Sequence, residues 1–115
     1  RMIYTIKEVA TQLNIKPSTL RYYDQKEILP NIKHNVAGYR FYDDLDLIYL
    51  QMIHYFKQAQ IPLNEIKKYL VYSSQGDKNS QEKQNLIQTF KTQISDKIMI
   101  LQSQKDHIDC LIKCN

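Results

Sequence analysis

Three residues near the C-terminal end could together bind a soft metal ion or take part in redox chemistry. His107, Cys110 and Cys114 are separated by three and four positions, a spacing that places them on one face of a helix. Imidazole and thiolate groups are ligands that zinc and copper prefer. The competing interpretation is that the two cysteines are small apolar residues of an interface or of an exposed tail. We favour this second interpretation and expect neither a metal nor another cofactor.

A second set of side chains, toward the N-terminal end, could bind nucleic acid. Arg21 can form a bidentate contact with guanine or with a phosphate, and only the guanine contact would distinguish DNA sequences. Lys16 stands where a capping Ser or Thr is usual, so it could contact a phosphate instead. Each aromatic residue could also merely pack, and each Lys or Arg could simply be solvated. The candidate DNA-binding residues are Lys16, Ser18, Thr19, Arg21, Tyr22, Tyr23, Lys33, Tyr39 and Arg40.

The distribution of charge favours the same region. The 115 residues carry a net charge of +4. Residues 1–42 hold seven Lys or Arg and three Asp or Glu, whereas the rest of the chain holds nine of each. All of the excess positive charge therefore lies in the first third of the chain, where a phosphate-binding surface is expected.

Length and composition exclude several classes of protein. A chain of 115 residues has room for one domain and is too short for a Rossmann unit with a substrate domain or for a TIM barrel. The two Gly residues form no phosphate-binding motif, and no nucleophile and base stand at a useful spacing, so no enzyme is expected. No apolar run suits a membrane span or a signal peptide, and we expect a cytoplasmic protein.

Capping and proline signals predict the elements that position the basic residues. Thr5 and Glu8 form a capping box, which starts a short first helix, and Asn14 tolerates the left-handed conformation of a sharp turn. Pro17 suits the first position of a second helix that ends near Glu27. Two short helices joined by a tight turn indicate a helix-turn-helix, whose second helix enters the major groove of DNA.

A β-hairpin wing and further helices are expected next. Residues 31–42 combine a polar stretch, a small tip and an aromatic segment of strand composition. Acidic residues at 43–46 favour the start of a third helix, and a short fourth helix follows Pro62. The expected apolar face of the third helix comprises Leu45, Ile48, Tyr49, Met52, Phe56 and Ala59.

Residues 81–115 predict one long helix with an apolar seam. This segment contains no Gly or Pro, and its apolar residues recur with heptad spacing, interrupted at Gln104 and Lys105. Such a helix is about 50 Å long and cannot cover its own seam, so we expect a homodimer. The predicted dimerisation residues are Ile87, Phe90, Ile94, Ile98, Leu101, Ile108, Leu111 and Ile112.

Two motifs resemble a known family. The residues Pro-Ser-Thr-Leu-Arg-Tyr-Tyr-Asp at 17–24 and Gly-Tyr-Arg-Phe-Tyr at 38–42 strongly resemble the mercury-resistance-regulator (MerR) family of bacterial transcription regulators. The resemblance covers nearly the whole chain. It implies a mainly α fold: a winged helix-turn-helix head over residues 1–72, a linker over 73–80 and an antiparallel coiled-coil dimerisation helix over 81–115.

The resemblance also implies a function. Members of the family bind a pseudo-palindromic promoter element as dimers and distort the DNA between the promoter elements, so that RNA polymerase can engage both. Family metal sensors use a Cys near the start of the dimerisation helix, but residues 73–86 contain none, and the effector is unknown. The alternative is an architectural or recombination accessory protein that bends double-stranded DNA without activating a promoter.

Overall fold

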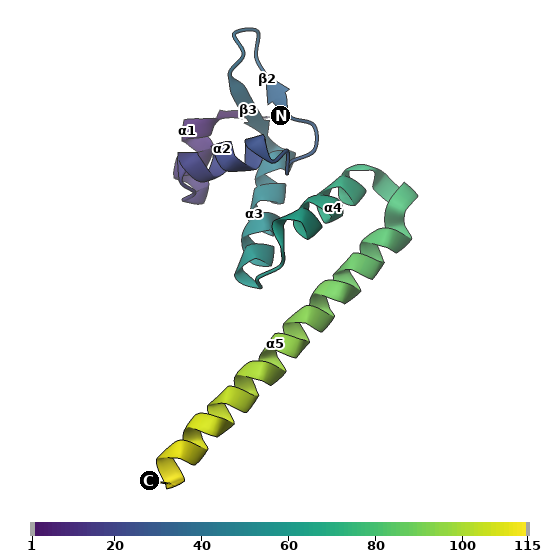
Figure 1. Ribbon diagram of the computed structural model, residues 1–115. Helices are drawn as coiled ribbons and strands as arrows, with labels where there is room; N and C mark the ends of the chain where they lie inside the picture. Colours follow the sequence, from purple (N-terminus) through teal and green to yellow (C-terminus); the bar gives the residue numbers. More distant parts are fainter. Residues whose placement is uncertain (1, 115) are drawn as a thin grey trace.

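A computed structural model describes residues 2–114, with side chains described as far as residue 113. A head at one end of the molecule contains the sheet and the first four helices, and a long helix extends away from it (Figure 1). In chain order the elements are β1 (Ile3–Thr5), α1 (Ile6–Leu13), α2 (Pro17–Gln25), β2 (Lys33–His34), β3 (Arg40–Asp43), α3 (Asp44–Gln58), α4 (Leu63–Ser74), the 3-10 helix η1 (Gly76–Asn79) and α5 (Ser80–Cys114).

The sheet has three antiparallel strands in the order β1-β3-β2. The expected wing is formed by β2 and β3, where Lys33 pairs with Phe41. The first strand was not expected from sequence. It pairs Tyr4 with Tyr42, and three residues ahead of a helix carry no strand pattern of their own. This pairing joins the start of the chain to the base of the wing.

Two capping boxes start the helices that flank the wing. The predicted box at α1 is present: the Glu8 carboxylate accepts from the Thr5 amide at 2.9 Å, and the Thr5 hydroxyl accepts from the Glu8 amide at 3.2 Å. A second box joins Asp43 and Asp46 at 3.0 Å in both directions and begins α3. Asn14 ends α1 in the left-handed conformation, as expected.

Several turns of the head have left-handed backbone at residues other than glycine. The second helix ends at Gln25, slightly earlier than expected, because Glu27 has a φ of 52° and cannot continue a right-handed helix. The residues other than Gly with this conformation are Asn14, Glu27, Asn31 and Gln60.

The buried face of α3 differs from the expected one. Tyr49 is buried and Met52, Phe56 and Ala59 pack against the core as expected, but Leu45 and Ile48 are exposed. The fully buried stripe lies one position along the helix, because α3 packs against both α4 and strand β3. Periodicity alone allows either of two adjacent stripes, and the neighbouring elements decide between them. The buried residues of α3 are Asp46, Leu47, Tyr49, Leu50 and Ile53.

The long helix α5 begins against the head and then leaves it. Residues 73–80, expected as a linker, are largely helical, in the last turn of α4 and in η1. Phe90 is only 2 % exposed, and its ring centroid lies 5.2 Å from Phe56 and 6.3 Å from Tyr69. Phe90 therefore belongs to the core of its own chain, not to the open seam where the heptad pattern places it. Across residues 2–114, no helix combines the length and apolarity that a membrane span requires.

Candidate nucleic-acid interface

The second helix of the helix-turn-helix presents one polar face to solvent. Leu20 is buried in the core, and this anchor leaves Ser18, Arg21 and Tyr22 exposed on the outer side of α2. Lys16 makes no side-chain cap and is exposed beside them. The residues named for DNA contact at the start of this helix thus form a continuous exposed face. Two others lie deeper: Thr19 and Tyr23 are half-buried.

The wing is a short hairpin with a well-defined tip. The Asn35 amide donates to the Tyr39 carbonyl at 2.9 Å, the Gly38 amide donates to the Asn35 carbonyl at 2.9 Å, and the Tyr39 amide donates to Asn35 Oδ1 at 3.0 Å. Gly38 supplies the left-handed φ of 88° that closes the turn. Tyr39 is 73 % exposed, as a residue that contacts DNA must be.

Arg40 does not project from the wing as the sequence analysis expected. Its side chain is only 7 % exposed, and its Nε donates to Asp24 Oδ1 at 3.1 Å. Its Nη1 donates to the carbonyls of Lys33 and Phe41, while the guanidinium stacks 4.0 Å from the Tyr42 ring centroid. Nη2 is buried and, among the described residues, has no hydrogen-bond partner. The main role of Arg40 is to join the wing to α2.

Lys33 is likewise engaged within the head. Its Nζ lies 3.2 Å from Asp46 Oδ2 and 3.4 Å from Asp43 Oδ2, and it donates to the Asn31 carbonyl at 2.9 Å. Burial raises the pKa of the Asp46 carboxyl, against the opposing effects of the Asp43 amide and the Lys33 ammonium. The lysine thus compensates the buried acidic residues of the second capping box and is not an open phosphate ligand.

A groove of about 580 Å³ separates α2 from the wing. Arg21 borders it on the helix side and Tyr39 on the wing side, so a strand backbone lying in it would meet both. His34, to which the sequence gave no role because no partner accompanies it, also borders the groove. The lining residues are Thr5, Ile6, Arg21, Asp24, His34, Asn35, Gly38, Tyr39, Arg40 and Phe41.

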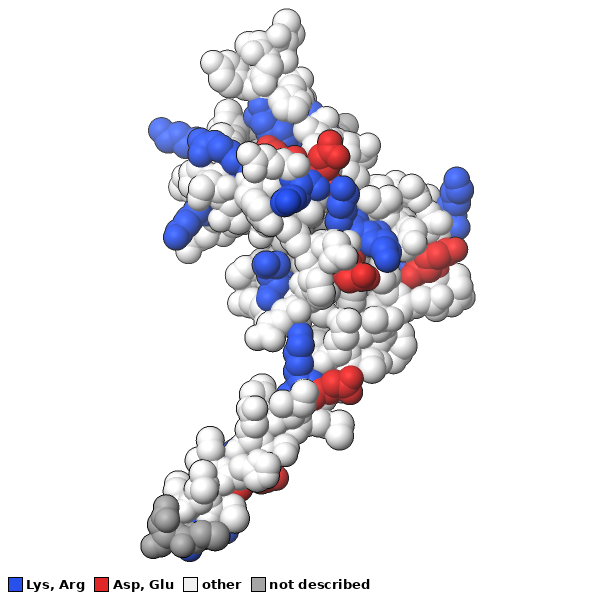
Figure 2. Space-filling model, viewed as in Figure 1, with Lys and Arg blue, Asp and Glu red and all other residues white. Residues whose placement is uncertain are grey.

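A second basic surface, which was not expected from sequence, lies where α2 ends and α4 begins. Lys67 Nζ donates to the Lys26 carbonyl at 3.3 Å, and Lys26 Nζ lies 5.8 Å from the centroid of the Tyr22 ring. A hollow of about 340 Å³ lies between these side chains. Figure 2 shows Lys and Arg side chains gathered over the head, including the region of α4. The four-residue spacing of Tyr22 and Lys26 was the available sequence signal; Lys67 is brought in only by the fold.

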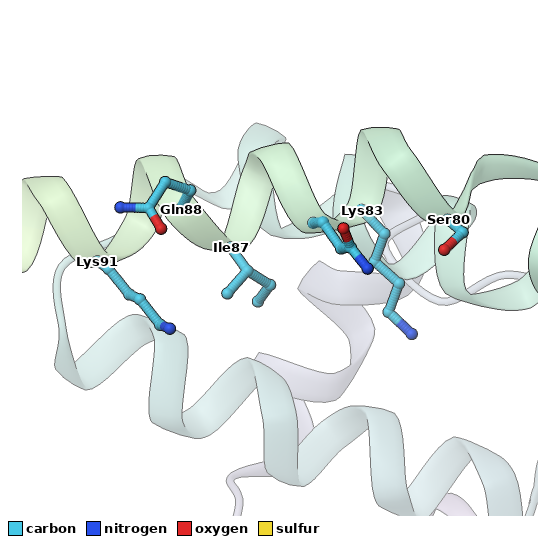
Figure 3. A pocket seen from close by; sticks show the side chains of 6 residues that line it. Ser80, Lys83, Ile87, Gln88 and Lys91 are labelled. Carbon is cyan, nitrogen blue, oxygen red and sulfur yellow. The ribbon is translucent and has the colours of Figure 1, made fainter.

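The seam of α5 is open to solvent in a single chain. Ile87 is half-buried against the core and borders a shallow groove of about 460 Å³. Figure 3 shows Ile87, Lys83 and Lys91 pointing to the same side of the helix. Farther along, the predicted seam residues are all exposed: Ile94, Ile98, Leu101, Ile108, Leu111 and Ile112.

The cysteine and histidine cluster is tested only in part. His107 and Cys110 are exposed near the end of α5, while the side chain of Cys114 lies outside the described residues. Within the described part of the chain, no three side chains of the His, Cys, Asp and Glu types come together in a metal-binding arrangement.

Comparison with known proteins identifies relatives of the whole fold. The transcriptional activator mta of Bacillus subtilis is 36 % identical over 98 residues, which cover 85 % of this chain and 38 % of that protein. An HTH-type transcriptional regulator of Haemophilus influenzae is 31 % identical over 87 residues, covering 76 % of this chain and 64 % of that protein. The chain spans about three fifths of the length of the first curated relatives: 64 % of the Haemophilus influenzae regulator and 59 % of the regulator AdhR of Bacillus subtilis.

Solved structures match over nearly the full chain. A MerR family regulator from Bacillus thuringiensis has a TM-score of 0.80 at 27 % identity, covering 99 % of this chain and 100 % of that one. HiNmlR, a MerR family regulator lacking the sensor domain and solved bound to promoter DNA, has a TM-score of 0.79 at 27 % identity, covering 97 % and 89 %. The model of the MerR HTH family regulatory proteins matches residues 4–72, more than half of the chain. The chain therefore belongs to the MerR family of helix-turn-helix regulatory proteins.

Proposed function

We propose that this chain is a transcription regulator that binds a pseudo-palindromic promoter element as a homodimer. It acts in the cytoplasm, without enzymatic activity, and distorts the DNA so that RNA polymerase can engage both promoter elements. The observation that carries the proposal is the exposed face of α2, where Ser18, Arg21 and Tyr22 stand together beside the groove that leads to the wing.

The head offers both kinds of contact that sequence-specific binding requires. In the middle of α2, the exposed Arg21 would donate to guanine O6 and N7 in the major groove. Lys16 and Tyr39 flank it, and Lys26 and Lys67 extend the basic surface on the other side. These flanking groups would hold phosphates and set the register of the head on DNA without reading bases.

The open seam of α5 supports the homodimer. Six apolar residues of the seam are exposed over its outer part, and an apolar stripe of this length on a single helix is stable only when another surface covers it. A second copy of the same helix, packed antiparallel, covers both seams at once. It also carries a second head, which pseudo-palindromic binding needs.

Distortion of the DNA is inferred from the family relationship. Binding to a promoter is further supported by HiNmlR, a MerR family regulator lacking the sensor domain that was solved bound to promoter DNA. Bending a site costs on the order of 1–6 kcal/mol, which contacts from two heads must offset. The basic surfaces on both sides of α2 are the candidates for those contacts.

Selection of bound DNA from genomic fragments tests this function. We expect recovered fragments to share two inverted half-sites, and footprinting should place protection between the two promoter elements. Enhanced cleavage at the centre of the footprint would report the distortion. An architectural or recombination accessory protein would instead protect DNA without regard to promoter position, and binding to no particular sequence would refute the proposal.

A further inference from the structure

Two neighbouring stripes of α5 make different contacts. The exposed part of the seam begins at Ile94, whereas Leu86, Phe90, Gln93 and Lys97, spaced four, three and four residues apart, are buried or half-buried. From residue 98 to residue 113, every side chain of α5 is exposed. Lys97 is therefore the last point at which α5 contacts its own head.

The contact that Lys97 makes is specific. Its Nζ donates to the carbonyl oxygens of Ala59 and Gln60, both at 3.1 Å. The backbone amides of these two residues and of Ile61 already donate to carbonyls within the last turn of α3. The two carbonyl groups that Lys97 binds lie just beyond the end of α3, where the helix dipole favours a positive charge.

Neither partner of Lys97 is a carboxylate. Among the described residues, Lys97 forms no ion pair, and its ammonium group donates hydrogen bonds only to these two carbonyls. A half-buried ammonium gives up part of its hydration, and it regains hydrogen bonds only when α5 lies at the tilt and rotation that bring both carbonyls within reach. An apolar side chain of the same length would fill the space without this directional requirement.

We propose that Lys97 is a positioning residue that fixes the angle between α5 and the head. Given the proposed function, it thereby sets the distance and rotation between the two recognition helices of the dimer. Seventeen residues separate Lys97 from the end of α5 at Cys114, a length of about 25 Å. A tilt of about 10° at Lys97 would move that end by about 4 Å, close to the rise of one base pair, about 3.4 Å.

The first experiment measures the angle without DNA. Nitroxide labels are attached at Thr11→Cys on α1 and Ser103→Cys on α5, in a background that carries Cys110→Ser and Cys114→Ser. Labelled protein is diluted with excess unlabelled protein, so that pulsed electron paramagnetic resonance reports distances within one chain. Both label sites are exposed and lie outside the proposed DNA contacts.

Two substitutions test Lys97 against a matched control. Lys97→Met keeps the length of the side chain and removes the donor, and it should broaden the distance distribution about twofold. Lys113→Met removes the same charge from an exposed position of α5 that is not among the seam residues and should leave the distribution narrow. Lys97→Arg retains donors for both carbonyls and should restore most of the narrow distribution. An unchanged distribution in Lys97→Met would overturn the proposal.

The second experiment measures the consequence for DNA. The selected site is compared with versions that carry one base pair more or one fewer between the half-sites. The unsubstituted dimer and Lys113→Met should prefer the selected spacing at least tenfold, and Lys97→Met should prefer it less than threefold while sedimenting as a dimer. Equal spacing preference in both variants would contradict the proposed consequence. If the unsubstituted protein selects no paired half-sites, the proposed function fails, and the distance measurement still decides the role of Lys97.

Discussion

Arg40 Nε on strand β3 donates to Asp24 Oδ1 on helix α2 at 3.1 Å. This ion pair crosses from the wing to α2, and the stacking of Arg40 on Tyr42 reinforces it. The wing and α2 are therefore linked by a largely buried charge pair, which fixes their relative position within the folded head.

Replacing Asp24 should weaken the head. Asp24→Asn leaves the buried Arg40 guanidinium without its counter-charge, and the free energy of unfolding should fall by about 2 kcal/mol, since Asp24 itself is partly exposed. Urea unfolding measures the change. The control is Glu65→Gln, which breaks the pair of this similarly exposed carboxylate with the exposed Lys68 at 3.8 Å and should cost less than about 0.5 kcal/mol. If both substitutions lower the free energy of unfolding equally, the Asp24–Arg40 pair stabilises the head no more than the Glu65–Lys68 pair does.

Removing Arg21 should relax DNA specificity. Arg21→Ala is expected to lose about 1–3 kcal/mol of binding to the selected site if the contact is to a guanine, and little of its binding to unrelated DNA. Fluorescence anisotropy titrations on both DNAs give the ratio. Lys78→Ala, an exposed cation in η1, serves as the control. Unchanged affinity for the selected site would remove Arg21 from the interface.

Removing Lys67 should lower DNA affinity without changing specificity, in contrast to the removal of Arg21. As a phosphate contact, Lys67→Ala should weaken binding to selected and unrelated DNA alike. It should reduce the slope of log affinity against log salt by about two, one for each head of the dimer. Titrations between low and moderate salt measure the slope. A full salt slope in the variant would mean that the surface around Lys26 and Lys67 does not touch DNA.

A charge on the seam should separate the dimer. Ile94→Asp or Leu101→Asp places a carboxylate where the second helix is expected to pack, and burial of an unpaired charge is strongly unfavourable. Sedimentation should show monomers with weak DNA binding. Met99→Asp changes an exposed residue that is not among the predicted seam residues and should leave the dimer intact. Intact dimers of both seam variants would disprove the coiled-coil pairing.

Tyr42 makes stability depend on pH in the alkaline range. Burial and then the nearby Asp24 charge raise the pKa of Tyr42 from 10.0 to about 12. The folded state therefore holds its proton between these values while the unfolded state releases it, so stability is lost as the pH rises from 10 to about 12. The loss should reach about 2 kcal/mol. Urea unfolding measures the free energy of unfolding at pH 10 and pH 12. Between these values it should fall by about 2 kcal/mol more in the unsubstituted protein than in Tyr42→Phe, which has no hydroxyl to titrate.

Local signals predicted most of the helices. The capping box at Thr5, the left-handed Asn14 and Pro17 at the start of α2 act within a few residues of themselves, so they are visible in sequence and present in the structure. Strand β1 was missed because it exists only through pairing with β3, about forty residues later.

The sequence identified the charged residues around the candidate site, but it did not predict what two of them contact. Arg40 and Lys33 were assigned to phosphates, because sequence shows a charge and does not show its counter-charge. The partner carboxylates, on the half-buried Asp24 and the buried Asp46, lie 16 and 13 residues away, on other elements. Phe90 fits the heptad pattern as well as Ile94 does, and only the aromatic side chains on α3 and α4 distinguish a core residue from a seam residue.

The placement of the two glycines determines where the molecule can bend. Several turns within the head use residues other than glycine in the left-handed conformation, and such residues have few alternative conformations. Gly38 lies at the tip of the wing, and Gly76 lies at the junction of α4 with η1, each with open space around its α-carbon. At Gly76 this freedom is limited, because Phe90 and Lys97 hold α5 against the head. We therefore expect backbone flexibility to be concentrated at the tip of the wing, where the hairpin could adapt to a bound surface while the joint between the head and α5 stays fixed.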